Sequence, residues 1–183
     1  MKTQQRVFSA LCLVFFATLT SAQQAGNEDT MRNCPMHKEG APADSHHVVL
    51  EKRGDEAMGF SHEKTTHHFF LSANGGSIEV TANEATDKRS VDAVRAHLSH
   101  IAVMFGDGDF GTPIFIHDGI PPGVTSMKLL KSKIQYKYEE ISSGGRVRIE
   151  SSDAIAIAAI HDFLRFQISE HGTGDPLKVA GQY

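Results

Sequence analysis

The stretch TTHHFFLSANGGSIEVTAN, residues 65–83, decides the fold. Two segments rich in β-branched and aromatic residues flank Asn74-Gly75-Gly76, where glycine supplies the positive φ of a tight turn. The stretch therefore predicts a β-hairpin.

A helix is expected directly after this hairpin, ending at the glycine-rich GDGDFG of residues 106–111. Asp87 or Ser90 can cap its start, because a short polar side chain accepts hydrogen bonds from the free N–H groups of the first turn. The apolar residues of the segment recur at helical spacing and form one stripe: Val91, Val94, Leu98, Ile101, Ala102 and Phe105.

The same pattern returns later in the chain. KIQYKYEEISSGGRVRIES at residues 133–151 predicts a second hairpin, and a second helix can be capped by Ser152 or Asp153. The connector contains a turn at Pro121-Pro122-Gly123 and a short helix near residues 126–131. We therefore predict an α+β fold, in which duplicated ββα units form a four-stranded antiparallel sheet with two long helices on one face.

The ends of the chain differ in composition from this central part. Residues 1–22 have a short basic start, an apolar stretch and small residues at the end, as a secretory signal peptide does. Residues 23–56 are polar and predict a flexible lead, followed by a single domain at 57–176 and a loose tail at 177–183. The mature protein is therefore expected in the periplasm or secreted, with no membrane insertion after processing.

Charge and cysteine content narrow the class of protein further. The chain has 18 basic and 22 acidic residues, a net charge of −4, which becomes −6 when Lys2 and Arg6 leave with the signal peptide. Scattered acidic charge argues against binding to nucleic acid or to an anionic membrane. Only Cys34 remains after processing, so no intramolecular disulfide is expected.

Histidine is the unusual component, with 11 residues, all after residue 22. Side chains alternate across a strand, so His67 is expected to face the helices together with Phe69, while the adjacent His68 points away. His97 and His100 lie three residues apart on the first helix, close enough to reach one ion. His97 borders the apolar stripe and is the better single candidate.

Two more candidates come from other segments. His117 lies in the connector and His161 borders the stripe of the second helix, whereas His171 is as readily a helix-capping residue. Each histidine alone is more often a hydrogen-bonded structural residue. Together, His67, His97, His117 and His161 come from four elements that can converge on one side of the sheet, which predicts a copper or zinc site.

The lead contains NCPMHKE, in which Cys34, Met36 and His37 form a soft ligand set that favours copper. It resembles the CPMH element near the N-termini of many bacterial heavy-metal efflux and copper-handling proteins. That resemblance implies a metal ion as ligand and metal efflux or resistance proteins as partners.

The segments RGDEAMGFSHEKTTHHF, RAHLSHIAVMFGDGDF, IHDGIPPGV and AAIHDFLRFQISEHGTGDP resemble a family of small exported bacterial proteins of uncertain function. The resemblance covers about residues 53–176. Some members of that family are labelled aspartate carbamoyltransferase. This chain has no phosphate-binding segment, and it is far shorter than the two α/β domains that this activity requires.

Four classes of function remain open, one of which is a purely structural protein. The leading hypothesis is an exported copper-handling protein that uses its clustered histidines. The alternatives are a metal-dependent enzyme with an open coordination position, in which a remaining histidine or Asp118 acts as acid or base, and a module that binds haem or a small ligand through His67 or His161.

Overall fold

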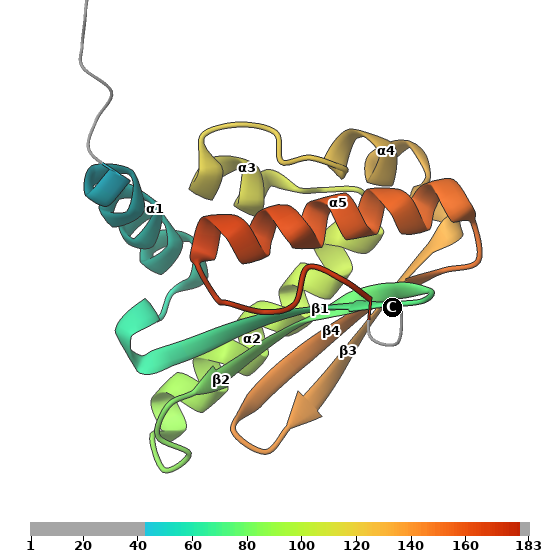
Figure 1. Ribbon diagram of the computed structural model, residues 1–183. Coiled ribbons are helices and arrows are strands. Elements are labelled where there is room, and N and C mark those ends of the chain that lie inside the picture. Colours follow the sequence, from blue (N-terminus) through green and yellow to red (C-terminus); the bar gives the residue numbers. More distant parts are fainter. Residues whose placement is uncertain (1–42, 180–183) are drawn as a thin grey trace, which may run out of the picture. The chain divides into compact units, whose positions relative to one another are not determined.

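The computed structural model describes residues 43–179 of the chain (Figure 1). Residues 1–42 lie outside this part, and with them the predicted signal peptide and the three candidate ligands of the lead, Cys34, Met36 and His37. The elements in chain order are α1 (Ala43–Met58), η1 (His62–Lys64), β1 (Thr65–Ser72), β2 (Gly75–Ala82), α2 (Lys88–Gly106), α3 (Gly111–His117), α4 (Val124–Leu129), η2 (Lys131–Lys133), β3 (Ile134–Ile141), β4 (Gly144–Ser151) and α5 (Ala154–His171).

The four strands form one antiparallel sheet in the order β1-β2-β4-β3. This confirms the predicted α+β class and the four-stranded antiparallel sheet. The two hairpins have strands of equal length, each closed by a two-residue turn. One face of the sheet carries the apolar residues that build the core: Phe69, Leu71, Ile78, Val80, Val147 and Ile149.

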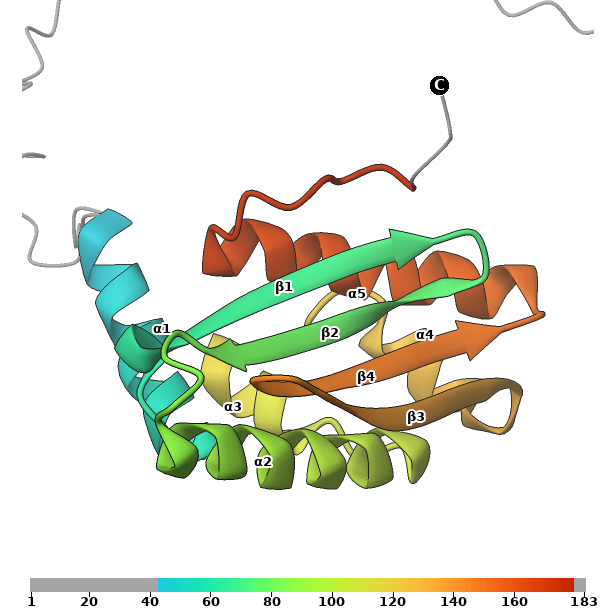
Figure 2. The ribbon, with the colours of Figure 1, turned by 90° about the horizontal axis from the view of Figure 1, so that it is seen from below.

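The two long helices cover this apolar face (Figure 2). α5 lies over β1 and β2, and α2 lies over β3 and β4. Asp87 caps α2 by accepting a hydrogen bond from the Ser90 N–H, and Asp153 caps α5 through the N–H groups of Ile155 and Ala156. These caps hold the start of each helix beside the end of the hairpin that precedes it.

The two hairpins are related by a regular shift along the chain. Ile134 begins β3 69 residues after Thr65 begins β1, and Ala154 begins α5 66 residues after Lys88 begins α2. At the centre of the sheet Ile78 pairs with Val147, the residue 69 positions later. We call positions related by these shifts equivalent: 69 for the hairpins and 66 for the helices.

Two equivalent glycines allow the helices to approach the sheet. A Cβ on Gly76 would overlap the Phe70 carbonyl oxygen and Leu164 of α5. A Cβ on Gly145 would lie 3.2 Å from Leu98 of α2. Leu98 and Leu164 are themselves equivalent, so each helix packs on a glycine of the other hairpin in the same way.

The domain extends beyond the predicted boundaries at both ends. Residues 43–56, predicted as part of the flexible lead, belong to α1, which packs through Leu50. Arg165 Nε donates a hydrogen bond to the Leu177 carbonyl oxygen and Val179 is buried, so these residues of the predicted loose tail are packed.

The connector also contains α3, a helix that was not expected. No helix between residues 43 and 179 is long and apolar enough to cross a membrane.

Candidate functional site

Four histidines surround a small cleft between the sheet and the helices. The cleft has a volume of about 70 Å³, and its floor is formed by apolar residues of β1, β2, α2 and α5. His67 comes from β1, His97 from α2, His117 from α3 and His171 from α5. Met58 of α1 closes the side of this inner cleft. Three of the four predicted histidines are thus brought together, and His171 takes the place of the fourth.

The imidazole rings form a connected group. The rings of His67 and His171 are stacked, with centroids 6.0 Å apart and planes 8° apart. The ring of His117 meets that of His171 edge-on at 5.2 Å. Phe60 lies between the other pair, since its ring centroid is 6.2 Å from that of His67 and 5.6 Å from that of His97. Phe60 therefore links His97 to the group.

Burial keeps these imidazoles neutral. Loss of solvation, together with the nearby His97, His68 and His62, lowers the pKa of His67 to about 4. Burial and the adjacent His100 lower the pKa of His97 to about 4. Burial, with His67, His117 and His47 nearby, lowers the pKa of His171 to about 3. At neutral pH these three rings therefore keep the lone pairs with which a histidine binds a metal.

A hydrogen bond and a longer contact with a carboxylate orient His117 from α5. Its Nε2 lies 3.1 Å from Gln167 Oε1, and its Nδ1 lies 3.9 Å from Glu170 Oε2. The side chain of His117 is only 2% exposed. Gln167 is also buried and lines the inner cleft, and its amide Nε2 has no hydrogen-bond partner among the described residues. A donor of this kind is costly to bury unless an acceptor reaches it.

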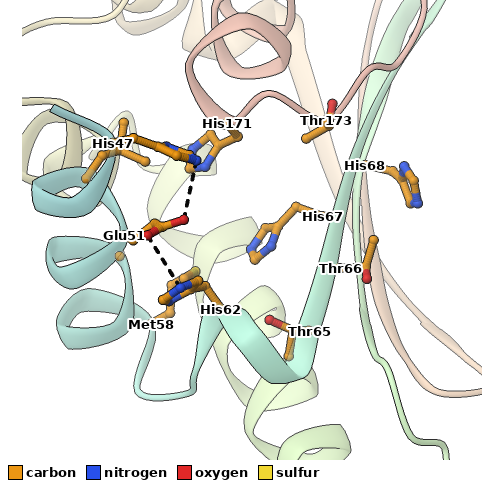
Figure 3. A pocket seen from close by; sticks show the side chains of 12 residues that line it. His47, Glu51, Met58, His62, Thr65, Thr66, His67, His68, His171 and Thr173 are labelled. Atoms are coloured by element: carbon orange, nitrogen blue, oxygen red, sulfur yellow. Dashed lines mark ion pairs between the residues drawn. The ribbon is translucent and has the colours of Figure 1, made fainter. Parts of the chain in front are cut away.

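A second, larger pocket adjoins the inner cleft on the side of α1 (Figure 3). This outer pocket has a volume of about 250 Å³. The two share one wall, made of Met58, His67 and His171. Figure 3 shows His67 directed into the space between β1 and α1, while His68 points to the opposite side of the strand. The alternation of side chains along β1 is thus as predicted.

The other candidates lie away from the inner cleft. His68 Nδ1 hydrogen-bonds Asp175 Oδ1 at 2.9 Å, and His100 is exposed on α2. His161 Nε2 hydrogen-bonds the Ser72 carbonyl oxygen at 2.9 Å, at the turn of the first hairpin. Asp118 ends α3 and pairs with Arg53 at 3.4 Å, with an exposed side chain, so it is not placed to act as an acid or base in the cleft.

Sequence reasoning missed two members of the cleft, Met58 and His171. His171 stands at the last position of α5, where a histidine is also expected as a cap. The structure turns its ring toward β1, where it stacks on His67. Its spacing of four residues from Gln167, and of eight from Phe163 in the apolar stripe, is the signal that places it on the core face.

Within residues 43–179, no three His, Cys, Asp or Glu side chains are already arranged around one point as metal ligands. The stacked rings of His67 and His171 explain this for the inner cleft, since stacking does not aim their nitrogens at a common position. Comparison of the chain with protein-family models, curated proteins and solved structures found no significant match.

Proposed function

We propose that this is an exported metal-binding protein that holds copper in the inner cleft, through His67, His97, His117, His171 and Met58. The observation that carries the proposal is the convergence of four imidazoles from four elements on one small cleft. Imidazole and thioether groups form a soft set that suits copper, above all Cu(I). The signal-peptide pattern of residues 1–22 supports export.

The second half of the fold argues that these imidazoles are not needed for packing. The positions equivalent to His67, His171 and His97 hold Tyr136, Phe105 and Phe163. The centroids of Tyr136 and Phe105 are 5.9 Å apart, close to the 6.0 Å between His67 and His171, although the first pair meets edge-on at 77° and the second is stacked at 8°. The fold thus accepts tyrosine and phenylalanine rings at the positions equivalent to these histidines. Because buried imidazoles stabilise a core less than such rings do, their presence in the first half favours a role in binding.

The size of the cleft favours an ion over an organic ligand. Pockets for small organic molecules measure roughly 300–1,000 Å³. The inner cleft measures about 70 Å³ and the outer pocket about 250 Å³. A haem group or a similar cofactor would need the helices to separate, whereas an ion needs only the rings of His67 and His171 to turn. The haem-binding alternative is therefore the weaker one.

Gln167 favours one alternative function, a metal-dependent enzyme. Its buried amide Nε2 could donate a hydrogen bond to a water or a small oxygen ligand on the metal. Such a ligand requires an open coordination position, as in catalytic metal sites. Replacement of Gln167 by leucine would then change the pH dependence of a copper-bound water, in addition to the loss of affinity that follows from the lost His117 hydrogen bond.

We also propose that the two ββα halves are copies of one unit. The constant shift of 69 residues between the hairpins, the central Ile78–Val147 pair and the reciprocal packing on Gly76 and Gly145 support this. On this proposal, one copy kept an aromatic core while the other acquired the imidazoles.

An anaerobic Cu(I) titration against a competing chelator tests the copper proposal. A background with Cys34→Ser, Met36→Leu and His37→Asn removes the ligands of the lead. We expect one equivalent of Cu(I) in this background, with a loss of affinity of at least about 100-fold in His67→Tyr and in His171→Phe. His161→Gln, outside the cleft, is the matched control and should bind as the background does.

Two results would contradict the proposal. One is a background protein that takes no Cu(I) from the chelator. The other is equal affinity in His67→Tyr, His171→Phe and His161→Gln, which would show that copper is held elsewhere.

A further inference from the structure

A second set of possible metal ligands lines the outer pocket, separate from the inner cleft. His47, Glu51 and Asp55 are spaced four residues apart on α1 and therefore share one face of the helix. His62 of η1 turns back toward this face. Glu51 lies between the two imidazoles: its Oε1 is 3.3 Å from His47 Nε2, and its Oε2 is 3.6 Å from His62 Nε2.

Asp55 fixes the orientation of His62. Its Oδ1 accepts hydrogen bonds from the backbone N–H of His62 at 2.7 Å and from the ring Nδ1 at 3.0 Å. With its proton on Nδ1, a neutral His62 directs the Nε2 lone pair toward Glu51. A carboxylate that holds the far nitrogen of an imidazole is the usual support of a metal-binding histidine.

Each contact of the Glu51 carboxylate with an imidazole needs either a proton on the ring nitrogen or a metal ion between the two groups. Each oxygen of its carboxylate faces an imidazole nitrogen, and a lone pair on that nitrogen would oppose the oxygen. A proton or a metal ion placed between the groups removes this opposition. Two donors on one tetrahedral zinc ion are about 3.3 Å apart, given metal–ligand distances of about 2.0–2.2 Å. The observed separations of 3.3 and 3.6 Å are close to that value.

The side chains can close around an ion without movement of the backbone. The His47 side chain is 52% exposed and that of Glu51 is 32% exposed. His47 can therefore change rotamer, so that its Nε2 approaches an ion placed between Glu51 Oε2 and His62 Nε2. This movement accounts for the lack of three converged donors in the structure.

We propose that His47, Glu51 and His62 form a second metal site, for a divalent cation such as zinc, at the entrance to the inner cleft. Imidazole and carboxylate ligands suit zinc or Cu(II), whereas the imidazoles and thioether of the inner cleft suit Cu(I). The shared wall of Met58, His67 and His171 places the outer ion beside the inner one. The proposed outer site is argued from the contacts of His47, Glu51 and His62 alone. Only its description as an entrance to a copper site rests on the proposed function.

Calorimetric titration of the full chain with zinc chloride tests this site. The background again carries Cys34→Ser, Met36→Leu and His37→Asn, so that the lead contributes no ligand. We expect one zinc ion per chain, and a loss of affinity of at least about tenfold in Glu51→Gln and in His62→Gln. Asp55→Asn should weaken binding less, because Asp55 acts by positioning His62. The matched control is Glu56→Gln, an exposed carboxylate on the same helix.

The outcome separates this proposal from the one for the inner cleft. Zinc binding that survives in His67→Tyr and His171→Phe, but is lost in Glu51→Gln, supports an outer site whether or not Cu(I) binds. An absence of zinc binding, or equal affinity in Glu51→Gln and Glu56→Gln, overturns it. Retained binding in His62→Gln would also overturn it, since His62 is the ligand that the structure orients.

Discussion

The rings of His67 and His171 are stacked, with their centroids 6.0 Å apart. The positions equivalent to these two histidines hold Tyr136 and Phe105. On the proposal that the two ββα units are copies, the same place in the architecture is filled once by two imidazoles and once by a tyrosine and a phenylalanine. This relationship makes the role of the histidines testable, because it offers substitutions that the fold itself already accepts.

The double variant His67→Tyr with His171→Phe should fold as the wild type does. Its rings are those of Tyr136 and Phe105, whose centroids are 5.9 Å apart, and they remove two desolvated imidazoles from the core. We expect a free energy of unfolding at pH 7 equal to that of the wild type within about 1 kcal/mol, or higher. Urea unfolding followed by circular dichroism measures it. A large loss of stability would show that the imidazoles serve packing after all.

Stability should depend on pH through the same cluster. The folded-state pKa values of His67 and His97 are about 4 and that of His171 is about 3, each below the ordinary value of 6.5. Above pH 6.5 neither the folded nor the unfolded state protonates these rings. Between pH 6.5 and about 4 only the unfolded state takes up protons, so stability falls by up to about 1.4 kcal/mol per pH unit for each histidine.

Urea unfolding at a series of pH values measures this slope. The double variant His67→Tyr with His171→Phe should lose the part of the slope that belongs to two histidines. An identical slope in the wild type and the double variant would mean that neither ring keeps a lowered pKa in the folded protein.

Metal binding by the inner cleft should be nearly independent of pH down to about pH 5. Imidazoles with ordinary pKa values lose metal as they protonate below about pH 6.5. Those of His67, His97 and His171 are already neutral, with pKa values of about 4, 4 and 3, so protons compete with the metal for these rings only in more acidic solution. Cu(I) competition titrations at pH 7 and pH 5 test this. A loss of affinity that begins near pH 6.5 would contradict it.

Asp175 should hold the C-terminal segment on the edge of the sheet. Its Oδ2 accepts hydrogen bonds from the Phe69 N–H at 2.9 Å and from Thr173 Oγ1 at 2.7 Å, while its Oδ1 is 2.9 Å from His68 Nδ1. Asp175→Ala leaves a strand-edge N–H without its acceptor. We expect a loss of about 1–3 kcal/mol in the free energy of unfolding. Faster amide hydrogen exchange at Phe69 should accompany it, and unchanged exchange there would refute the contact.

The equivalent glycines should differ in their tolerance of alanine. At Gly76 the new methyl group would overlap a backbone oxygen, which cannot move aside, whereas at Gly145 it would meet the side chains of Tyr138 and Leu98. Gly76→Ala should therefore cost about 1–3 kcal/mol or more and Gly145→Ala less. Thermal unfolding compares the two. Leu164→Ala should not rescue Gly76→Ala, because the overlap with the backbone remains.

The features that could be predicted from the sequence are those set by local pattern. Alternation along β1 placed His67 on the helix side, and polar residues before apolar stripes predicted the caps of α2 and α5. The helix α1 carries no comparable stripe: Leu50 is its one fully buried apolar residue among those whose side chains are described. Its position depends on packing against the rest of the domain, which no local pattern reveals.

The difference between His161 and His171 shows the same limit. Both lie on α5, and His161 borders the apolar stripe as a ligand candidate should. Ten residues of helix separate them by about 15 Å, so only one can reach the cleft. The direction in which α5 packs across β1 decides which of the two histidines reaches the cleft. This packing places His161 at the hairpin turn and His171 beside His67.

The most direct test of the copper site is a long-range ¹H–¹⁵N spectrum of the histidine rings, recorded while Cu(I) is added to the ¹⁵N-labelled background protein. We predict that the ring nitrogens of His67, His97, His117 and His171 shift together with one equivalent of copper, while those of His161 do not. Unchanged signals from these four rings, or shifts confined to histidines outside the inner cleft, would contradict the proposal that this cleft binds copper.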